Sequence, residues 1–159
     1  MLTDIFVSRP TMITRTFEAE YAVVETWLRR KGYRARRVGA DAYTMDAPLK
    51  GVMDLMKKCR GAIILGYPQY HVTASLSKGG KAEQKMQAIF PTPWNQIEAT
   101  LAFRRGIPVL VVAHNGVSGG IFDYGVTGEY VHATNLGRKD WHKDAGFQAL
   151  FCDWEKRVK

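Results

Sequence analysis

Ala62-Ile63-Ile64-Leu65 is an uninterrupted apolar run. A short run that is apolar at every position is typical of a central parallel strand, because helices cover both of its faces. Residues 108–112 have the same character, and residues 4–8 form a similar run that Arg9-Pro10 ends. These three segments predict the buried centre of a parallel sheet.

Segments with helical signals alternate with these strands, and their ends are marked by N-cap residues, prolines and glycines. Helices are expected from the cap Thr16 to Gly32, from Asp46-Ala47-Pro48, from Thr92-Pro93 to Gly106 and from Asp140. A further strand is expected at residues 33–38, near an edge of the sheet, and a weaker strand or a loop at residues 130–133. This order predicts the α/β class. We expect a flavodoxin-like, three-layer α/β/α arrangement with a central parallel sheet of about five strands.

A chain of 159 residues suits one hydrophobic core, so we expect a single domain over residues 1–159. Residues 71–93 fit the alternating pattern least well, because this connection is long, polar and contains several glycines and lysines. At the ligand-binding edge of the sheet such a connection predicts an insert that forms a lid or a rim, with a short helix at residues 82–89. Residues 140–157 are expected to form the C-terminal helix.

The composition argues against several classes of protein. The net charge is 23 − 15 = +8, but the basic residues form three separate clusters, so a nucleic-acid partner is not favoured. No apolar run approaches the ~18 residues of a membrane helix, and residues 1–10 do not resemble a signal peptide. Cys59 and Cys152 form no CxxC pair and the four histidines are scattered, so we expect no disulfide framework and no metal site. A cytoplasmic location is the default expectation.

One residue of the helix after Thr92-Pro93 is anomalous. Its apolar stripe is predicted to hold Trp94, Ile97, Leu101 and Ala102, and Glu98 falls inside that stripe. A carboxylate facing a packed sheet costs several kcal/mol unless it is paired or lies at the mouth of a pocket. Two interpretations stay open: a structural ion pair with an arginine such as Arg9, or a desolvated carboxylate with a raised pKa at a site beside an aromatic side chain.

Three motifs together resemble a TIR domain of the NAD-consuming type found in bacterial immunity. Residues 4–8, DIFVS, resemble the opening strand of that family, and residues 59–70, CRGAIILGYPQY, resemble its central strand with the proline and tyrosine that follow. Residues 94–98 reproduce its W-x-x-x-E helix signature. The likeness covers residues 4–113. The sequence departs from the family pattern in the long stretch 71–93, in Asn95 where many TIR domains have cysteine, and in the residues after 113.

The resemblance implies an enzyme that cleaves the nicotinamide–ribose bond of NAD in antiphage defence. NAD would be the substrate, no separate cofactor would be required, and the product would be ADP-ribose or a cyclic isomer. Glu98 would be the catalytic carboxylate, because it can stabilise or attack a cationic ribosyl group. The residues implied for NAD binding are Phe6, Ser8, Arg9, Tyr67 and Trp94. The guanidinium of Arg9 or Arg15 would bind the pyrophosphate of NAD.

The resemblance also implies partners. It suggests self-association through TIR–TIR contacts, with the loop at residues 39–46 completing the site between subunits, and a partner effector or sensor protein. Two other functions stay open. A nucleoside 2-deoxyribosyltransferase shares the flavodoxin-like arrangement and also uses a helix glutamate, and a catalytically silent TIR adaptor would act through protein contacts alone and would tolerate substitution of Glu98.

Overall fold

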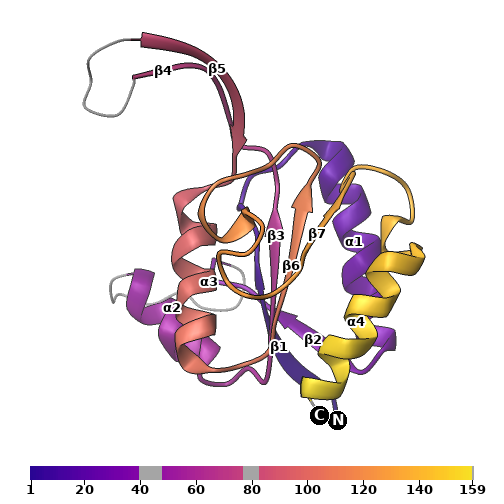
Figure 1. Cartoon of the computed structure of the whole chain (residues 1–159). Helices are drawn as coiled ribbons and strands as arrows, with labels where there is room; N and C mark the ends of the chain where they lie inside the picture. The colour runs from indigo at the N-terminus through magenta and orange to yellow at the C-terminus, as the bar shows by residue number, and fades with distance from the viewer. Residues whose placement is uncertain (40–47, 77–82, 159) are drawn as a thin grey trace.

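The computed structural model describes residues 1–39, 48–76 and 83–158, and in them a parallel five-stranded sheet lies between two layers of helices (Figure 1). The strand order is β2-β1-β3-β6-β7, which is the flavodoxin-like order, and confirms the predicted fold class. The strands are β1 (Thr3–Ser8), β2 (Tyr33–Arg36), β3 (Ala62–Gly66), β6 (Val109–His114) and β7 (Val131–Thr134). The helices are α1 (Arg15–Arg30), α2 (Pro48–Met56), α3 (Pro93–Arg105) and α4 (Ala145–Val158).

β3 is the central strand, as its unbroken apolar run predicts. It pairs in parallel with β1 through Val7 and Ile63, and with β6 through Ile63 and Leu110. Every residue of β3 is buried. β2 pairs with β1 alone and forms one edge of the sheet, which confirms the predicted edge position of residues 33–38, although the strand ends at Arg36.

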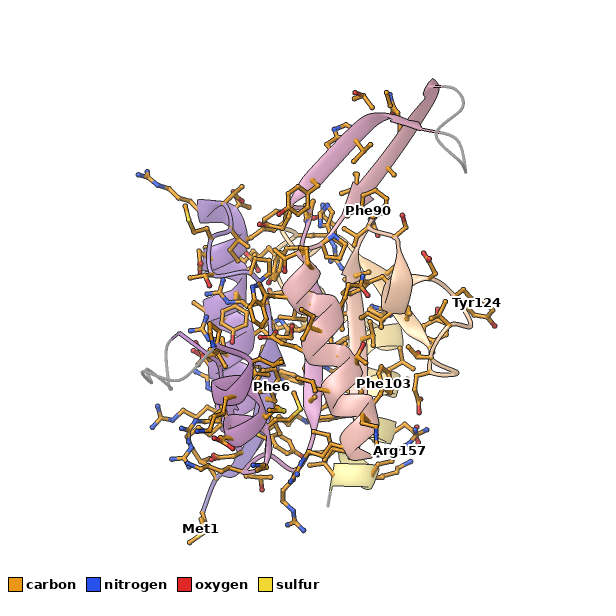
Figure 2. All side chains as sticks on the ribbon, turned by 90° about the vertical axis from the view of Figure 1, so that its left-hand side faces the viewer. Met1, Phe6, Phe90, Phe103, Tyr124 and Arg157 are labelled. Carbon is orange, nitrogen blue, oxygen red and sulfur yellow. The ribbon has the colours of Figure 1, made fainter. Side chains whose placement is uncertain are left out.

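Each face of the sheet has its own hydrophobic core. Ile5, Val7 and Ile63 face one core, together with side chains of α1 and α4. Phe6 and Ile64 face the other core, together with side chains of α2 and α3. Figure 2 shows Phe6 inside the molecule, whereas Tyr124 lies at its margin. Successive side chains of a strand therefore pack against opposite helical layers, because they point to opposite faces of the sheet.

Local capping signals set the ends of α3. Thr92 is the N-cap, its side chain accepts a hydrogen bond from the Asn95 N–H, and Gly106 ends the helix with φ 74 in the left-handed region. Both ends agree with the prediction. The predicted cap of α1 is wrong by two residues: Thr14, not Thr16, accepts from the Phe17 N–H, so Thr16 lies in the first turn.

The C-terminal helix begins later than predicted. A 3-10 turn, η2 (Trp141–Lys143), follows Asp140, and α4 starts only at Ala145. Asp140 has φ 59 and Asp144 is extended with ψ 139, so two non-helical residues flank η2 and prevent one continuous helix over 140–157.

Residues 71–93 contain a β-hairpin instead of the predicted short helix. β4 (Tyr70–Leu76) and β5 (Glu83–Phe90) are antiparallel and form a separate two-stranded sheet that extends away from the body of the molecule (Figure 1). The pairing of β5 with β4 overrides the helix propensity of residues 83–90. The connecting residues 77–82 lie outside the described residues.

The base of the hairpin is joined to the body by backbone hydrogen bonds. Gln69 N–H donates to the Phe90 carbonyl at 3.0 Å, and Ser118 N–H donates to the Ile89 carbonyl at 3.0 Å. Ile89 also forms an isolated bridge with Val117. β5 therefore leads from an anchored base directly into the cap of α3.

We expect the backbone amides of β4 and β5 to exchange with solvent roughly a hundredfold faster than those of β3. An isolated two-stranded sheet is marginally stable, whereas β3 exchanges only when the core opens. Hydrogen–deuterium exchange read out on proteolytic peptides measures both segments in one experiment. Equal protection of the hairpin and β3 would contradict this expectation and would show that further contacts stabilise the hairpin.

In the part of the chain that the structure describes, no helix is long and apolar enough to cross a membrane.

Candidate active site

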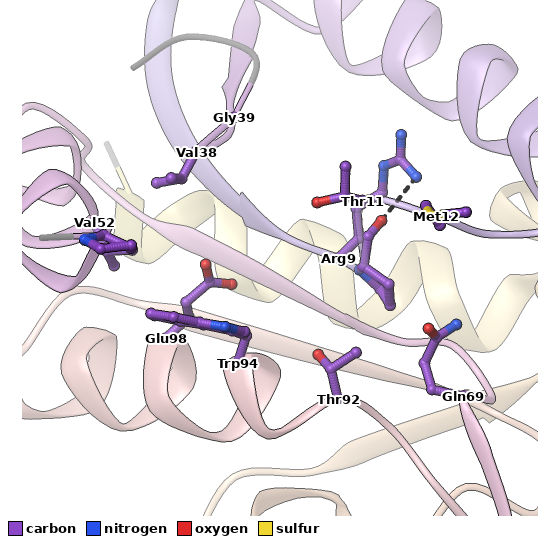
Figure 3. Close-up of a pocket in the computed structure, with 12 residues that line it drawn as sticks. Arg9, Thr11, Met12, Val38, Gly39, Val52, Gln69, Thr92, Trp94 and Glu98 are labelled. Carbon is purple, nitrogen blue, oxygen red and sulfur yellow. Dashed lines mark hydrogen bonds between the residues drawn. The ribbon is translucent and has the colours of Figure 1, made fainter. Parts of the chain in front are cut away.

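A cavity of about 410 Å³ lies where the carboxyl ends of β1 and β3 meet the start of α3 (Figure 3). In this fold the direction of the connections reverses between these two strands, and ligands bind in the resulting crevice. The volume lies within the range of about 300–1,000 Å³ that is typical of small-molecule sites. The lining residues are Arg9, Pro10, Thr11 and Met12 after β1, Val38 and Gly39 after β2, Pro48 and Val52 of α2, Gln69 after β3, and Thr92, Trp94 and Glu98 at α3.

Glu98 is the carboxylate of this cavity. Only 9% of the residue is exposed, and its carboxyl group points into the space between α3 and the loop after β1 (Figure 3). Burial raises the pKa of the carboxyl from an ordinary 4.5 to about 7, and a hydrogen bond from Ser8 acts in the opposite direction. A carboxyl with this pKa is close to half ionised at neutral pH, which suits proton transfer or nucleophilic chemistry.

Arg9 and Glu98 do not form an ion pair, so the first of the two interpretations of Glu98 is wrong for this arginine. The Arg9 guanidinium binds both carboxylate oxygens of Glu18, at 2.9 and 3.1 Å, donates to the Pro10 carbonyl and packs over the Tyr21 ring. Within residues 1–39, 48–76 and 83–158, Glu98 has no salt-bridge partner. Glu98 is therefore a desolvated carboxylate, as the second of the two interpretations predicts.

The apolar stripe predicted for α3 is partly wrong. Its buried residues are Asn95, Glu98, Ala99 and Ala102, while Trp94 and Ile97 are 43% and 40% exposed. The small side chains of Ala99 and Ala102 let α3 approach the sheet closely. The polar residues of the same buried face, Asn95 and Glu98, lie near the edge of the sheet at which the parallel strands end. Trp94 consequently forms an open wall of the cavity, one turn of helix from Glu98.

Ser8 lies close to Glu98 and is not open to a substrate. It is 1% exposed, and its Oγ accepts a hydrogen bond from Asn95 Nδ2 at 2.8 Å. Asn95, expected with Thr92 at the polar end of the stripe that points to the cleft, is equally buried.

Phe6 and Tyr67 do not line the cavity, contrary to expectation. Phe6 is fully buried between the sheet and the α2–α3 layer. Tyr67 is fully buried on the opposite face with Leu65, and its ring lies 5.1 Å from that of Phe17. Side chains two residues apart share a face, so Tyr67 follows Leu65 toward α1 and away from Glu98.

Arg15 is the first residue of α1 and does not line the cavity, whereas Arg9 does. The loop expected to complete the site, residues 39–46, lies outside the described residues except for Gly39.

A second cavity of about 200 Å³ adjoins the first, since it shares Arg9 and Glu98 and adds Val7 and Arg37. Among the described residues, no group of three His, Cys, Asp or Glu side chains is arranged to hold a metal ion.

No protein-family model and no curated protein matches the sequence. Among solved structures, the fold is similar to a CMP N-glycosidase of Clostridium botulinum, BcmB, with a TM-score of 0.55 and 14% sequence identity. The match covers 94% of this chain and 99% of that chain. At this identity the likeness shows a shared α/β fold over nearly the whole of both chains.

Proposed function

We propose that this protein is an N-glycosidase that cleaves the bond between a base and the ribose of a nucleotide. One observation carries the proposal: Glu98, a buried carboxylate that has no ion-pair partner in the described part of the chain, faces a cavity at the ligand-binding edge of the sheet, beside the exposed ring of Trp94. The similarity in fold to a CMP N-glycosidase supports the same class of reaction.

The chemistry of this bond explains why one carboxylate is useful. Cleavage passes through a state in which positive charge develops on the ribose ring. An ionised Glu98 would stabilise that charge or attack the anomeric carbon to give a glycosyl–enzyme ester, which water then hydrolyses. Low exposure strengthens the electrostatic effect, because little water competes with the carboxylate.

NAD is the substrate that we propose first. Glu98 is the one carboxylate among the described residues that line the cavity, and a substrate whose base leaves without being protonated suits a single carboxylate. Nicotinamide leaves as a neutral molecule from its cationic ring and needs little help from a general acid. The resemblance to NAD-consuming TIR domains supports the same substrate, with ADP-ribose or a cyclic isomer as product, self-association and a role in antiphage defence as further parts of the proposal.

A pyrimidine nucleotide such as CMP is the second candidate, because the matched solved structure is described as acting on CMP. A 2-deoxyribosyltransferase would use the same carboxylate but would pass the sugar to a second base. These candidates differ in leaving group and acceptor, so product analysis separates them.

The deciding experiment incubates the purified protein separately with NAD, with CMP, and with deoxycytidine plus free adenine, followed by chromatography of the products. Release of nicotinamide supports the first candidate, release of cytosine from CMP supports the second, and formation of deoxyadenosine indicates transfer. The Glu98→Gln variant, run in parallel, excludes a contaminating enzyme. Absence of turnover with every substrate would contradict the proposal and favour the silent adaptor.

Trp94→Ala is expected to raise the KM of the cleaved substrate roughly tenfold and to change kcat less. The exposed Trp94 ring walls the cavity, and stacking of a base on an aromatic side chain contributes about 1–3 kcal/mol to binding. Ile97→Ala is the matched control, because Ile97 lies on the same helix with similar exposure and does not line the cavity. A KM that Trp94→Ala leaves unchanged would show that the base binds elsewhere.

A further inference from the structure

Two adjoining cavities lie at the edge of the sheet where the parallel strands end, and each has lining residues of its own. Glu98 and Arg9 line both cavities. Trp94 lines the larger cavity and not the smaller one, whereas Arg37 lines the smaller cavity and not the larger one. In Figure 3 the Trp94 ring lies beside Glu98 on α3, and Val38, the residue after Arg37, lies across the cavity from them. Glu98 therefore lies between an aromatic end and a basic end of one site.

Arg37 lies in the chain after β2, and its guanidinium packs over an aromatic ring. The guanidinium carbon of Arg37 lies 5.0 Å from the centre of the Tyr21 ring, and that of Arg9 lies 4.4 Å from the same point. Packing over a ring uses the face of a guanidinium and leaves its five N–H donors, which lie in its plane, for hydrogen bonds. The Arg37 guanidinium can therefore donate to a phosphate and keep its other contacts at the same time.

Arg9 is mostly engaged within the protein, but one of its donors is not. Its Nη1 and Nη2 bind both carboxylate oxygens of Glu18, and Nη1 also donates to the Pro10 carbonyl. The Arg9 side chain is only 6% exposed, and its Nε–H is buried and has no acceptor among the described residues. Buried donors are nearly always satisfied, and an oxygen of an anion bound in the smaller cavity would supply the acceptor.

The size and charge of the smaller cavity suit one charged group of a ligand. Its volume is about 200 Å³, below the range of about 300–1,000 Å³ that is typical of sites for whole small molecules. Its charged lining residues in the described part of the chain are Arg9, Arg37 and Glu98. Guanidinium groups bind phosphate through paired N–H donors, so a phosphate fits this lining better than an uncharged base does.

We propose that the smaller cavity is the subsite for the phosphate of the substrate and that Arg37 is the residue that selects phosphorylated substrates. The proposal rests on the function proposed above. A nucleotide carries its ribose between the base and the phosphate, and the site presents Glu98 between Trp94 and Arg37 in the same order. A base on Trp94 and a phosphate at Arg37 would place the ribose at Glu98. Arg37 is not one of the arginines that the resemblance to TIR domains implies for the pyrophosphate of NAD.

The test measures the binding of ribose 5-phosphate and of ribose by isothermal titration calorimetry. Ribose 5-phosphate carries the sugar and the phosphate that NAD and CMP share, and its binding needs no turnover. The wild type is compared with Arg37→Met, in which an unbranched side chain can still cover the Tyr21 ring but the charge and the N–H donors are lost. Arg30→Met is the matched control, because Arg30 is exposed at the end of α1 and lines neither of the two cavities.

The wild type is expected to bind ribose 5-phosphate more tightly than ribose. Arg37→Met should weaken the binding of ribose 5-phosphate roughly tenfold, the effect of losing a hydrogen bond between charged groups, and should leave the binding of ribose unchanged. Arg30→Met should change neither. A wild type without preference for ribose 5-phosphate, or an Arg37→Met variant that binds it as tightly as the wild type, would overturn the proposal. Arg37→Gln provides the same comparison if Arg37→Met does not fold.

A kinetic readout separates this proposal from the proposed function. Arg37→Met should raise the KM of the cleaved nucleotide roughly tenfold and leave kcat/KM for the matching nucleoside, cytidine or nicotinamide riboside, unchanged. An unchanged KM for the nucleotide in an active enzyme would overturn the role of Arg37 and leave the glycosidase function standing. A wild type that cleaves none of the substrates but binds ribose 5-phosphate through Arg37 would refute the proposed function and leave the phosphate subsite standing.

Discussion

Glu98→Gln is expected to lose two to four powers of ten in the rate of glycosidic cleavage. This corresponds to roughly 3–5 kcal/mol of transition-state stabilisation. Glutamine fills the same space but carries no negative charge, so it can neither balance a cationic ribosyl group nor form an ester with the anomeric carbon. The variant should fold normally, because a neutral side chain replaces a buried group that has no ion-pair partner in the described residues.

Asp54→Asn is the matched control for this experiment. Asp54 lies on the neighbouring helix α2, has a half-exposed side chain and pairs with Lys57. Its neutralisation changes the net charge by the same amount at a residue that does not line the cavity. Rates are compared per folded molecule, with the folded fraction taken from circular dichroism. A Glu98→Gln variant that cleaves the substrate as fast as the wild type would exclude Glu98 as the catalytic carboxylate.

The same substitution is expected to stabilise the protein at alkaline pH. The pKa of Glu98 rises from 4.5 to about 7 through burial, so the folded state binds the proton more tightly than the unfolded state does. The contribution of this group to stability is therefore fully present below pH 4.5 and is lost as the pH rises toward and through 7. Since one pKa unit corresponds to about 1.4 kcal/mol, the loss reaches up to about 3 kcal/mol.

Thermal unfolding of wild type and Glu98→Gln at pH 5 and pH 8.5 measures this effect. The two proteins should have similar Tm values at pH 5, and the variant should exceed the wild type by roughly 5–10 °C at pH 8.5. The comparison cancels the other titrating groups, which both proteins share. A variant that is less stable than the wild type at pH 8.5 would mean that the Glu98 carboxylate contributes a stabilising interaction, against its assignment as a desolvated group.

Local signals in the sequence were sufficient for most of the sheet and for α3. The unbroken apolar run 62–65 predicts a strand covered on both faces, and β3 is that strand at the centre of the sheet. Thr92 and Gly106 mark the ends of α3 because a side-chain cap and a left-handed glycine act within a few residues of the helix. These interactions join residues that are close together in the sequence, so the sequence alone predicts them.

The hairpin β4–β5 could not be predicted in this way. Residues 83–90 have good helix propensity, and their strand conformation depends on pairing with β4, for example Ala88 with Val72. Likewise, Thr14 and Thr16 both lie near the start of α1, and the hydrogen bond that Thr14 accepts from the Phe17 N–H identifies Thr14 as the cap. In both places the sequence permits more than one local structure, and contacts formed in the folded chain select one.

For the candidate site, the sequence by itself determined that a carboxylate lies on the buried face of a helix beginning at a ligand-binding edge. The tertiary structure decided the rest. It pairs Arg9 with Glu18, turns Tyr67 toward α1, and brings Asn95 within 2.8 Å of Ser8, 87 positions earlier in the chain. These outcomes depend on which strand face and which helix meet in space, and residues so far apart in sequence carry no local signal of their contact.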